Sequence, residues 1–123
     1  MIKIIFCLRR KPGLSVEEFQ RYWREDHAAL VRRHAPALKI RRYVQSHTFD
    51  DPRIAAGLAV RGSEIEPYDG VAELWWDSIE DLIEVRLTEE GRAGGRELLE
   101  DERDFVSMAE SPIFYAHENV VID

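Results

Sequence analysis

The segment Tyr68–Asp81, YDGVAELWWDSIED, joins a strand pattern directly to the start of a helix. Its strand part alternates two sets of side chains, Val71, Glu73 and Trp75 against Ala72, Leu74 and Trp76. A period of two is typical of a β-strand. Asp77 or Ser78 then caps the helix, because a short polar side chain can accept a backbone N–H of the first turn.

Two elements precede this segment near the N-terminus. Ile2–Leu8 is almost entirely apolar, which is typical of a central strand, and Lys11-Pro12-Gly13 supplies the turn that ends it. Ser15 and Glu18 have the spacing of a capping box. From there an apolar stripe at three-and-four spacing predicts a helix over 16–34.

The alternation of Lys39–Phe49 predicts the second strand. Asp50–Pro67 is long for a loop and therefore functional or mobile, with a short helical turn expected over 54–60. The helix that begins at Ile79 is expected to end near Gly91. Gly94-Gly95 is then expected to interrupt the helical pattern. A third helix follows, with an apolar side at Leu98, Leu99, Phe105, Val106 and Ala109 and an exposed side at Glu97, Glu100, Asp101 and Asp104. Ile113–Ile122 predicts the fourth strand.

The resulting order, β-α-β-β-α-β, is that of the ferredoxin-like fold, an α+β class with a four-stranded antiparallel sheet and helices on one face. The length of 123 residues fits a single domain, 1–123. The strands carry large apolar side chains on both parities, so a second layer must cover the open face. A two-fold homodimer with the sheets face to face, and a small-molecule pocket against each sheet, provides that layer.

Composition narrows the function classes. The formal net charge of −7 disfavours binding to nucleic acid. The apolar run at the N-terminus, which ends at Leu8, is too short to span a membrane and lacks a signal-peptide cleavage site. We therefore expect no membrane association and a cytoplasmic location. No metal-type spacing or nucleotide-binding loop is present, so no metal and no cofactor are expected. The stretch 28–49 holds five Lys or Arg residues and no acid, which indicates either a solvated face or an anion-binding surface.

Two motifs extend across most of the chain. The first consists of Phe19, Tyr22, Trp23, His27, Leu30, Val31, Pro36, Tyr43, Gln45 and His47, and the second is Tyr68–Ser78. With these residues at this spacing, the chain resembles the EthD family of dimeric α+β barrel proteins over nearly its whole length. The resemblance implies the fold and the homodimer. The family and its wider relatives include proteins tied to ether degradation, fungal decarboxylases or dehydratases, polyketide cyclases, lactone isomerases and cofactor-free quinone-forming monooxygenases, which share proton transfer on a small, often aromatic substrate.

Four residues are candidates for catalysis: His27, Tyr43, His47 and Glu73. His27 is either a packing histidine or a general acid or base, since its pKa lies near working pH. Tyr43 and His47 share one strand face with Gln45; on a cavity face they can orient a phenol or carbonyl, and on the helix face they are unusual core residues. Glu73 is either a pocket carboxylate with a raised pKa or the partner of Arg41 or Arg42. The residues expected to contact substrate are Tyr22, Trp23, Gln45, Trp75, Tyr115 and His117.

These features predict a cofactor-independent lyase, isomerase or cyclase that acts on a small aromatic or polyketide-like substrate. The alternative is a protein that binds a small hydrophobic ligand without turning it over, or an accessory protein of a degradation pathway such as ether oxidation. Whether the chain is an enzyme at all stays open at the level of sequence.

Overall fold

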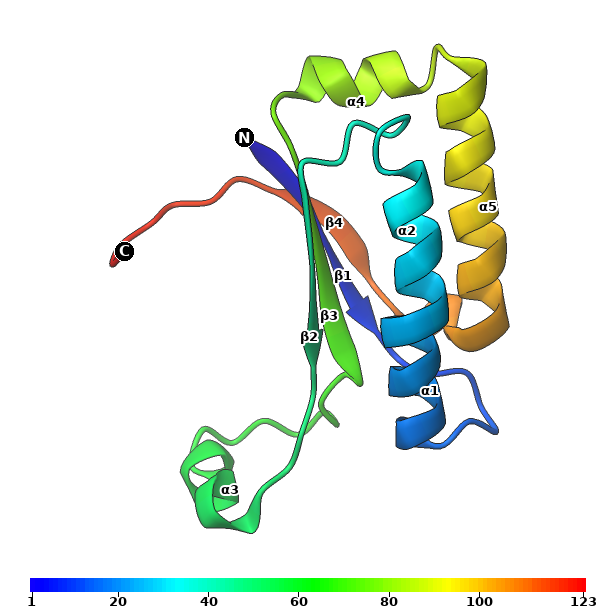
Figure 1. The fold of residues 1–123 in the computed structure, drawn as a ribbon. Helices are drawn as coiled ribbons and strands as arrows, with labels where there is room; N and C mark the ends of the chain where they lie inside the picture. The colour runs from blue at the N-terminus through cyan, green and yellow to red at the C-terminus, as the bar shows by residue number, and fades with distance from the viewer.

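The computed structural model describes residues 1–123, and its four strands form one antiparallel sheet in the order β2-β3-β1-β4. The strands are β1 (Ile2–Leu8), β2 (Arg42–His47), β3 (Gly70–Trp76) and β4 (Ile113–Ala116). Figure 1 shows the long helices on one side of this sheet and none covering the other. The predicted α+β class and ferredoxin-like topology are confirmed.

The first helical segment begins at the predicted capping box, where the Ser15 side chain accepts the Glu18 N–H and the Glu18 side chain accepts the Ser15 N–H. It contains α1 (Val16–Tyr22), a π-helical turn (Trp23–His27) and α2 (Ala28–His34). The predicted range is confirmed. The π-helical turn was not predicted: the Ala28 N–H donates to the Trp23 carbonyl, five residues back.

The second helical segment differs from the prediction at its glycines. α4 (Ile79–Val85) is short, and α5 (Glu89–Phe105) runs through Gly94-Gly95 without a break. The predicted interruption is wrong because Gly94 is a contact point between helices. A Cβ there would lie 3.1 Å from Nδ1 of His34, so the missing side chain lets α5 approach α2 closely.

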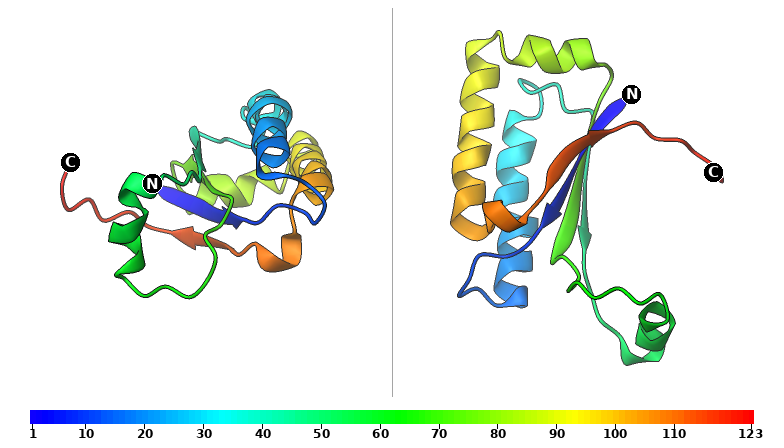
Figure 2. Two further views of the ribbon diagram at one scale, coloured as in Figure 1. Left: turned by 90° about the horizontal axis from the view of Figure 1, so that it is seen from below. Right: turned by 180° about the vertical axis from the view of Figure 1, so that it is seen from behind.

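Two segments project from the body of the molecule. The predicted helical turn in the long loop is present as α3 (Pro52–Ala59), which has no buried residue and extends away from the sheet (Figures 1 and 2). The fourth strand is shorter than predicted: pairing stops at Ala116, and the chain beyond it runs as an unpaired tail on the side opposite the helices (Figure 1).

The strand register decides which side chains face the helices. Tyr43 lies opposite Leu74, which lies opposite Ile4, and all three pack on the core between sheet and helices. By alternation Tyr43, Gln45 and His47 belong to this helix face. Glu73, opposite Ile5 and Val44, faces the open side instead.

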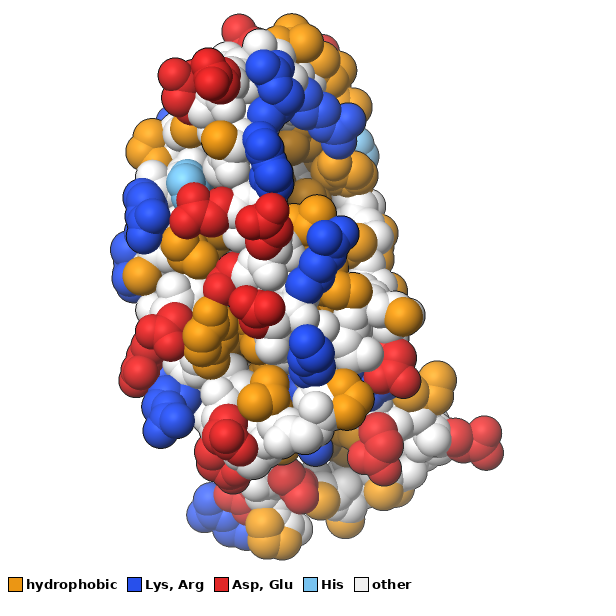
Figure 3. Space-filling model, turned by 90° about the vertical axis from the view of Figure 1, so that its right-hand side faces the viewer, with side chains coloured by type: hydrophobic (Ala, Val, Ile, Leu, Met, Phe, Trp, Pro, Cys, Tyr) orange, Lys and Arg blue, Asp and Glu red, His pale blue; other side chains and the backbone are white.

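The core has two clusters. The larger is formed by Phe6, Leu8, Phe19, Trp23, Ala72, Phe105 and Val106, and the smaller by Val31, Leu38, Val85 and Leu98. Outside it, acidic and basic side chains intermingle over the helical side of the molecule (Figure 3). No helix is both long and apolar enough to span a bilayer.

Candidate acid–base site between helices and sheet

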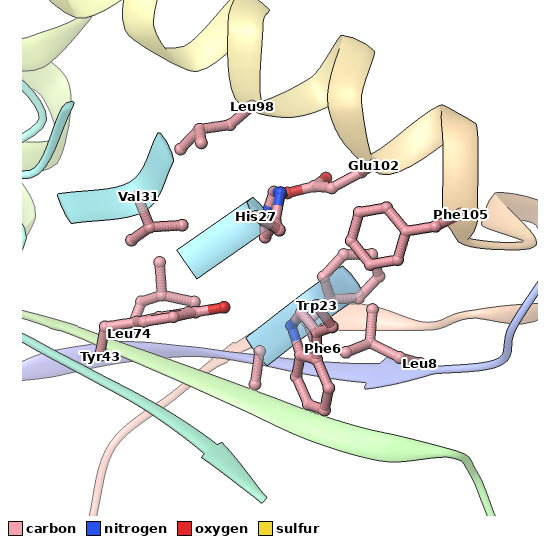
Figure 4. A pocket seen from close by; sticks show the side chains of 11 residues that line it. Phe6, Leu8, Trp23, His27, Val31, Tyr43, Leu74, Leu98, Glu102 and Phe105 are labelled. Atoms are coloured by element: carbon pink, nitrogen blue, oxygen red, sulfur yellow. The ribbon is translucent and has the colours of Figure 1, made fainter. Parts of the chain in front are cut away.

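A small cavity lies between the helices and the sheet (Figure 4). Its volume is about 30 Å³, which is room for one water molecule. The lining residues are Phe6, Leu8, Trp23, His27, Val31, Tyr43, Ala72, Leu74, Leu98, Glu102 and Phe105. His27, Glu102, the Tyr43 hydroxyl and the Trp23 indole bring polar atoms to this otherwise apolar wall.

His27 is the last residue of the π-helical turn and is only 4% exposed. Its Nδ1 lies 2.7 Å from the Asp101 carboxylate, and its Nε2 lies 3.6 Å from Oε2 of Glu102. A carboxylate only accepts, so Nδ1 carries the proton in the neutral ring. The lone pair of Nε2 then faces Glu102. Burial lowers the pKa of His27, although its hydrogen bond to Asp101 acts in the opposite direction.

Glu102 reaches the same cavity from α5. Its side chain is 20% exposed, and burial together with the nearby Asp101 charge raises its pKa to about 7. A protonated Glu102 can donate to Nε2 of His27, whereas an ionised Glu102 favours a proton on that nitrogen. His27 and Glu102 therefore lie side by side in the cavity, with a ring nitrogen that can accept a proton 3.6 Å from a carboxyl whose pKa is raised to about 7.

Asp101 is held by two donors. The Tyr22 hydroxyl donates to Oδ1, and His27 occupies Oδ2. The hydrogen bond from Tyr22 to Asp101, together with burial, raises the pKa of Tyr22 above its ordinary value. Tyr22 was expected to contact substrate, but its hydroxyl hydrogen is directed at Asp101 and stays outside the cavity. The arrangement fixes the imidazole ring of His27.

Gln45 links the edge strand to the π-helical turn. Its Nε2 donates to the Trp23 carbonyl at 2.9 Å and to the Tyr43 hydroxyl at 3.0 Å, while its Oε1 accepts from Nε2 of His47 at 2.9 Å. Both amide hydrogens are thus used within the protein. Because Tyr43 accepts from Gln45, the hydroxyl keeps its own hydrogen to donate, and Figure 4 shows its oxygen pointing into the cavity.

His47 lies beside this network and does not line the cavity. Its ring is 4.5 Å from the Trp23 ring, centroid to centroid, and its Nδ1 is buried without a hydrogen-bond partner. Burial, with a smaller contribution from Arg24, lowers the pKa of His47. A neutral ring that donates from Nε2 satisfies the Gln45 oxygen.

Glu73 and Trp75 lie on the opposite face of the sheet. Nζ of Lys3 is 2.5 Å from Glu73 and 3.5 Å from Glu118, and the Trp75 indole donates to Glu118 at 2.7 Å. Of the two alternatives for Glu73, the pairing with Arg41 or Arg42 is wrong: Glu73 pairs with Lys3, and Arg42 stacks over the Trp75 ring. The structure therefore separates Glu73 from the other three catalytic candidates.

The last two binding candidates lie at the far edge. Tyr115 is 52% exposed and lines a shallow groove with Ile79 and Ile83 of α4, whereas His117 lies beside Lys3 and Ile5 in a groove near the tail. Neither lines the cavity.

Asp101 and Glu102 are site residues that the sequence analysis missed. Asp101 was assigned to an exposed helix side, but its side chain is only 12% exposed. The buried residues of α5 are Gly91, Gly94, Leu98 and Phe105, and their three-and-four spacing passes through positions 101 and 102. That spacing was the available signal. No group of three or more His, Cys, Asp or Glu side chains is arranged to hold a metal ion.

The EthD domain family model matches residues 11–112. An EthD family protein from Bacillus halodurans is 20% identical with a TM-score of 0.62, over 97% of this chain and 99% of that one. An EthD-like protein from Ralstonia eutropha is 14% identical with a TM-score of 0.61, over 99% and 93%. HapK from Hahella chejuensis is 13% identical with a TM-score of 0.56, over 100% and 96%. At these identities the solved structures show a shared fold.

Among proteins with curated functions, none matches significantly. The family match spans most of the chain, from the turn after β1 to the start of β4. It includes the π-helical turn with His27, the Tyr43–Gln45–His47 network and the two acids on α5. The chain belongs to the EthD domain family.

Proposed function

We propose that this chain is a cofactor-independent enzyme of the lyase, isomerase or cyclase type that acts on a small aromatic or polyketide-like molecule. The observation that carries the proposal is the His27–Glu102 pair, which presents a proton acceptor and a proton donor in an apolar cavity. A group whose pKa lies near working pH suits general acid–base chemistry, and the pKa of Glu102 is raised to about 7.

Each residue has a distinct part in the proposed chemistry. The pair removes a proton from carbon or oxygen of the substrate and returns it to another atom, which gives isomerisation or cyclisation, or to a leaving group, which gives elimination. The Tyr43 hydroxyl donates to the carbonyl or phenol oxygen where negative charge develops. Asp101 orients His27, and Gln45 orients Tyr43, so both are positioning residues.

The cavity volume bears on substrate entry. Room for one water molecule means that a substrate reaches the pair only when apolar lining side chains move aside on binding. The same small, largely apolar cavity favours a second candidate function, in which the chain binds a small hydrophobic ligand and does not turn it over, or serves as an accessory protein of a degradation pathway.

We also propose a homodimer in which the open sheet face meets a second copy. The tail residues Val120, Val121 and Ile122 are 68%, 83% and 91% exposed, and Phe114 of the open face is 48% exposed. Burial of such apolar surface favours association. Sedimentation should report twice the chain mass, and Val121→Asp should shift the equilibrium toward the monomer; a wild-type chain that sediments as a monomer would refute the dimer.

Deuterium incorporation tests the acid–base function without knowledge of the true substrate. We expect the wild-type chain to catalyse exchange of the methyl protons of para-hydroxyacetophenone in D₂O, measured by ¹H NMR. Replacement of the paired groups in Glu102→Gln or His27→Gln should lower the rate by about 100-fold or more. The matched controls are Glu100→Gln, exposed on the same helix, and His34→Gln, which pairs with Glu97 outside the cavity.

The outcomes separate the two candidate functions. Exchange that the controls keep and the two site variants lose supports the enzyme. Saturable thermal stabilisation by the ketone without any exchange supports the ligand-binding protein, and equal exchange in all five proteins would remove the His27–Glu102 pair from the chemistry.

A further inference from the structure

A second hollow lies outside the cavity, between α2 and the edge strand β2, which run beside each other in Figure 1. Its volume is about 250 Å³. The apolar lining comes from Ala28, Val31, Ala35, Ile40 and Tyr43. Arg32 and Arg41 also line the groove, together with Arg42, whose guanidinium stacks over the Trp75 ring. An apolar lining of this kind accommodates a flat ring, and the basic rim formed by the arginines accommodates an anionic group.

The spacing of α2 explains why the groove exists. Ala28, Val31, Arg32 and Ala35 follow the i, i+3, i+4, i+7 pattern and therefore share the helix face toward β2. The two alanines leave space that larger side chains would fill. The stem of Arg32 follows the same face, so its guanidinium stands beside the opening.

The charges of the rim are largely uncompensated. Arg32 makes no ion pair within 4 Å, whereas its neighbour Arg33 is 3.4 Å from Glu97 of α5. Arg41 contacts Asp77 at 3.4 Å, but both side chains are more than half exposed, so this pair is weak. In a chain of net charge −7, a groove without an acid of its own is a local basic site.

The groove and the cavity share two wall residues, Val31 and Tyr43. Tyr43 therefore stands between the basic rim and the His27–Glu102 pair. A planar molecule about the size of one aromatic ring, held by its anionic end at Arg32, would extend from the rim toward Tyr43.

We infer that the groove between α2 and β2 binds a carboxylate on a planar small molecule, with Arg32 as the main contact to the anion. This inference rests on the proposed function, because it takes the Tyr43 hydroxyl as a donor to the substrate. It adds that the groove selects an anionic substrate and directs its far edge to the cavity. A guanidinium matches a carboxylate with two parallel hydrogen bonds.

Benzoate is the probe, and benzamide is its neutral counterpart. In ¹H–¹⁵N spectra of the full chain, benzoate should shift the backbone amides of Val31, Ile40 and Tyr43, and benzamide should shift them less at equal concentration. Arg32→Gln should weaken benzoate binding about fivefold, as for an exposed ion pair of about 1 kcal/mol. The matched control is Arg33→Gln, which removes the same charge one residue away.

Equal weakening by the two arginine variants, equal binding of benzoate and benzamide, or shifts located elsewhere would overturn the inference. Ketone exchange by the wild-type chain separates this test from the enzyme proposal. Arg32-dependent benzoate binding by a wild-type chain that shows no ketone exchange keeps the groove and refutes the catalysis. Ketone exchange without benzoate binding keeps the catalysis and refutes the groove.

Discussion

Glu102→Gln should change how the stability of the chain depends on pH. The pKa of this carboxyl rises from its ordinary 4.5 to about 7 in the folded chain, mainly through burial. An acid whose pKa is higher when folded binds its proton more tightly in that state. Its contribution to stability is therefore complete below about pH 4.5 and is lost as the pH rises through 7.

The size of this effect follows from the two pKa values. One pKa unit corresponds to about 1.4 kcal/mol, so ionisation of Glu102 costs the fold about 3 kcal/mol by pH 8. The glutamine amide stays neutral at every pH in this range and has nearly the same shape as the carboxyl. We expect the variant to match the wild type near pH 4.5 and to be more stable by about 3 kcal/mol at pH 8.

Urea denaturation of both proteins at about five pH values between 4.5 and 8 measures this difference in the free energy of unfolding. The titration of groups that both proteins share cancels when the two free energies are subtracted. Glu100→Gln is the control, because this residue is exposed on the same helix. Its difference from the wild type should be independent of pH. A Glu102→Gln curve parallel to that of the wild type would show that the pKa of Glu102 is the same in the folded and unfolded chains, and its raised pKa would be refuted.

Three further tests concern packing and hydrogen bonding in the fold. Gly70→Ala should lower the free energy of unfolding by about 2 kcal/mol or more, because a Cβ there would lie 2.4 Å from the Trp23 ring, whereas Gly57→Ala, with open space around it, should not destabilise. Gly95→Ala should raise the melting temperature through helix propensity, and Gly94→Ala should raise it less, since its Cβ meets His34; equal gains would refute the close approach of α5 to α2. Gln45→Ala should cost about 1 to 3 kcal/mol in denaturant unfolding, since it leaves buried partners unsatisfied, and an unchanged midpoint would contradict the network.

Local patterns predicted most of the fold. Alternation in β3, the Ser15 capping box and the apolar stripe of the first helix each depend on residues close together in sequence, and each was found where expected. The Gly94-Gly95 pair misled because its role depends on His34, sixty residues earlier. The final strand was overextended because alternation continues past Ala116, where β1 no longer offers a pairing partner.

The site was predicted in part for a similar reason. Three of the candidates, Trp23, His27 and Tyr43, line the cavity, but Asp101 and Glu102 looked like ordinary residues of an acidic helix. Their burial depends on which side of α5 meets the first helix, which is a property of tertiary packing. Glu73 failed to join the other candidates because strand parity alone does not say which face the helices cover.

The π-helical turn follows from the spacing of the buried residues in the first helix. Phe19, Trp23, His27 and Val31 are all at most 4% exposed and are each four residues apart. In an α-helix with 3.6 residues per turn, each step of four overshoots by about 40°, so three steps would rotate the last residue well away from the sheet. A π-helical turn is wider, and a step of four within it falls short of a full turn. Placing that step between Trp23 and His27 offsets the drift, which keeps His27 aimed at Glu102 while the Trp23 carbonyl accepts from both Ala28 and Gln45.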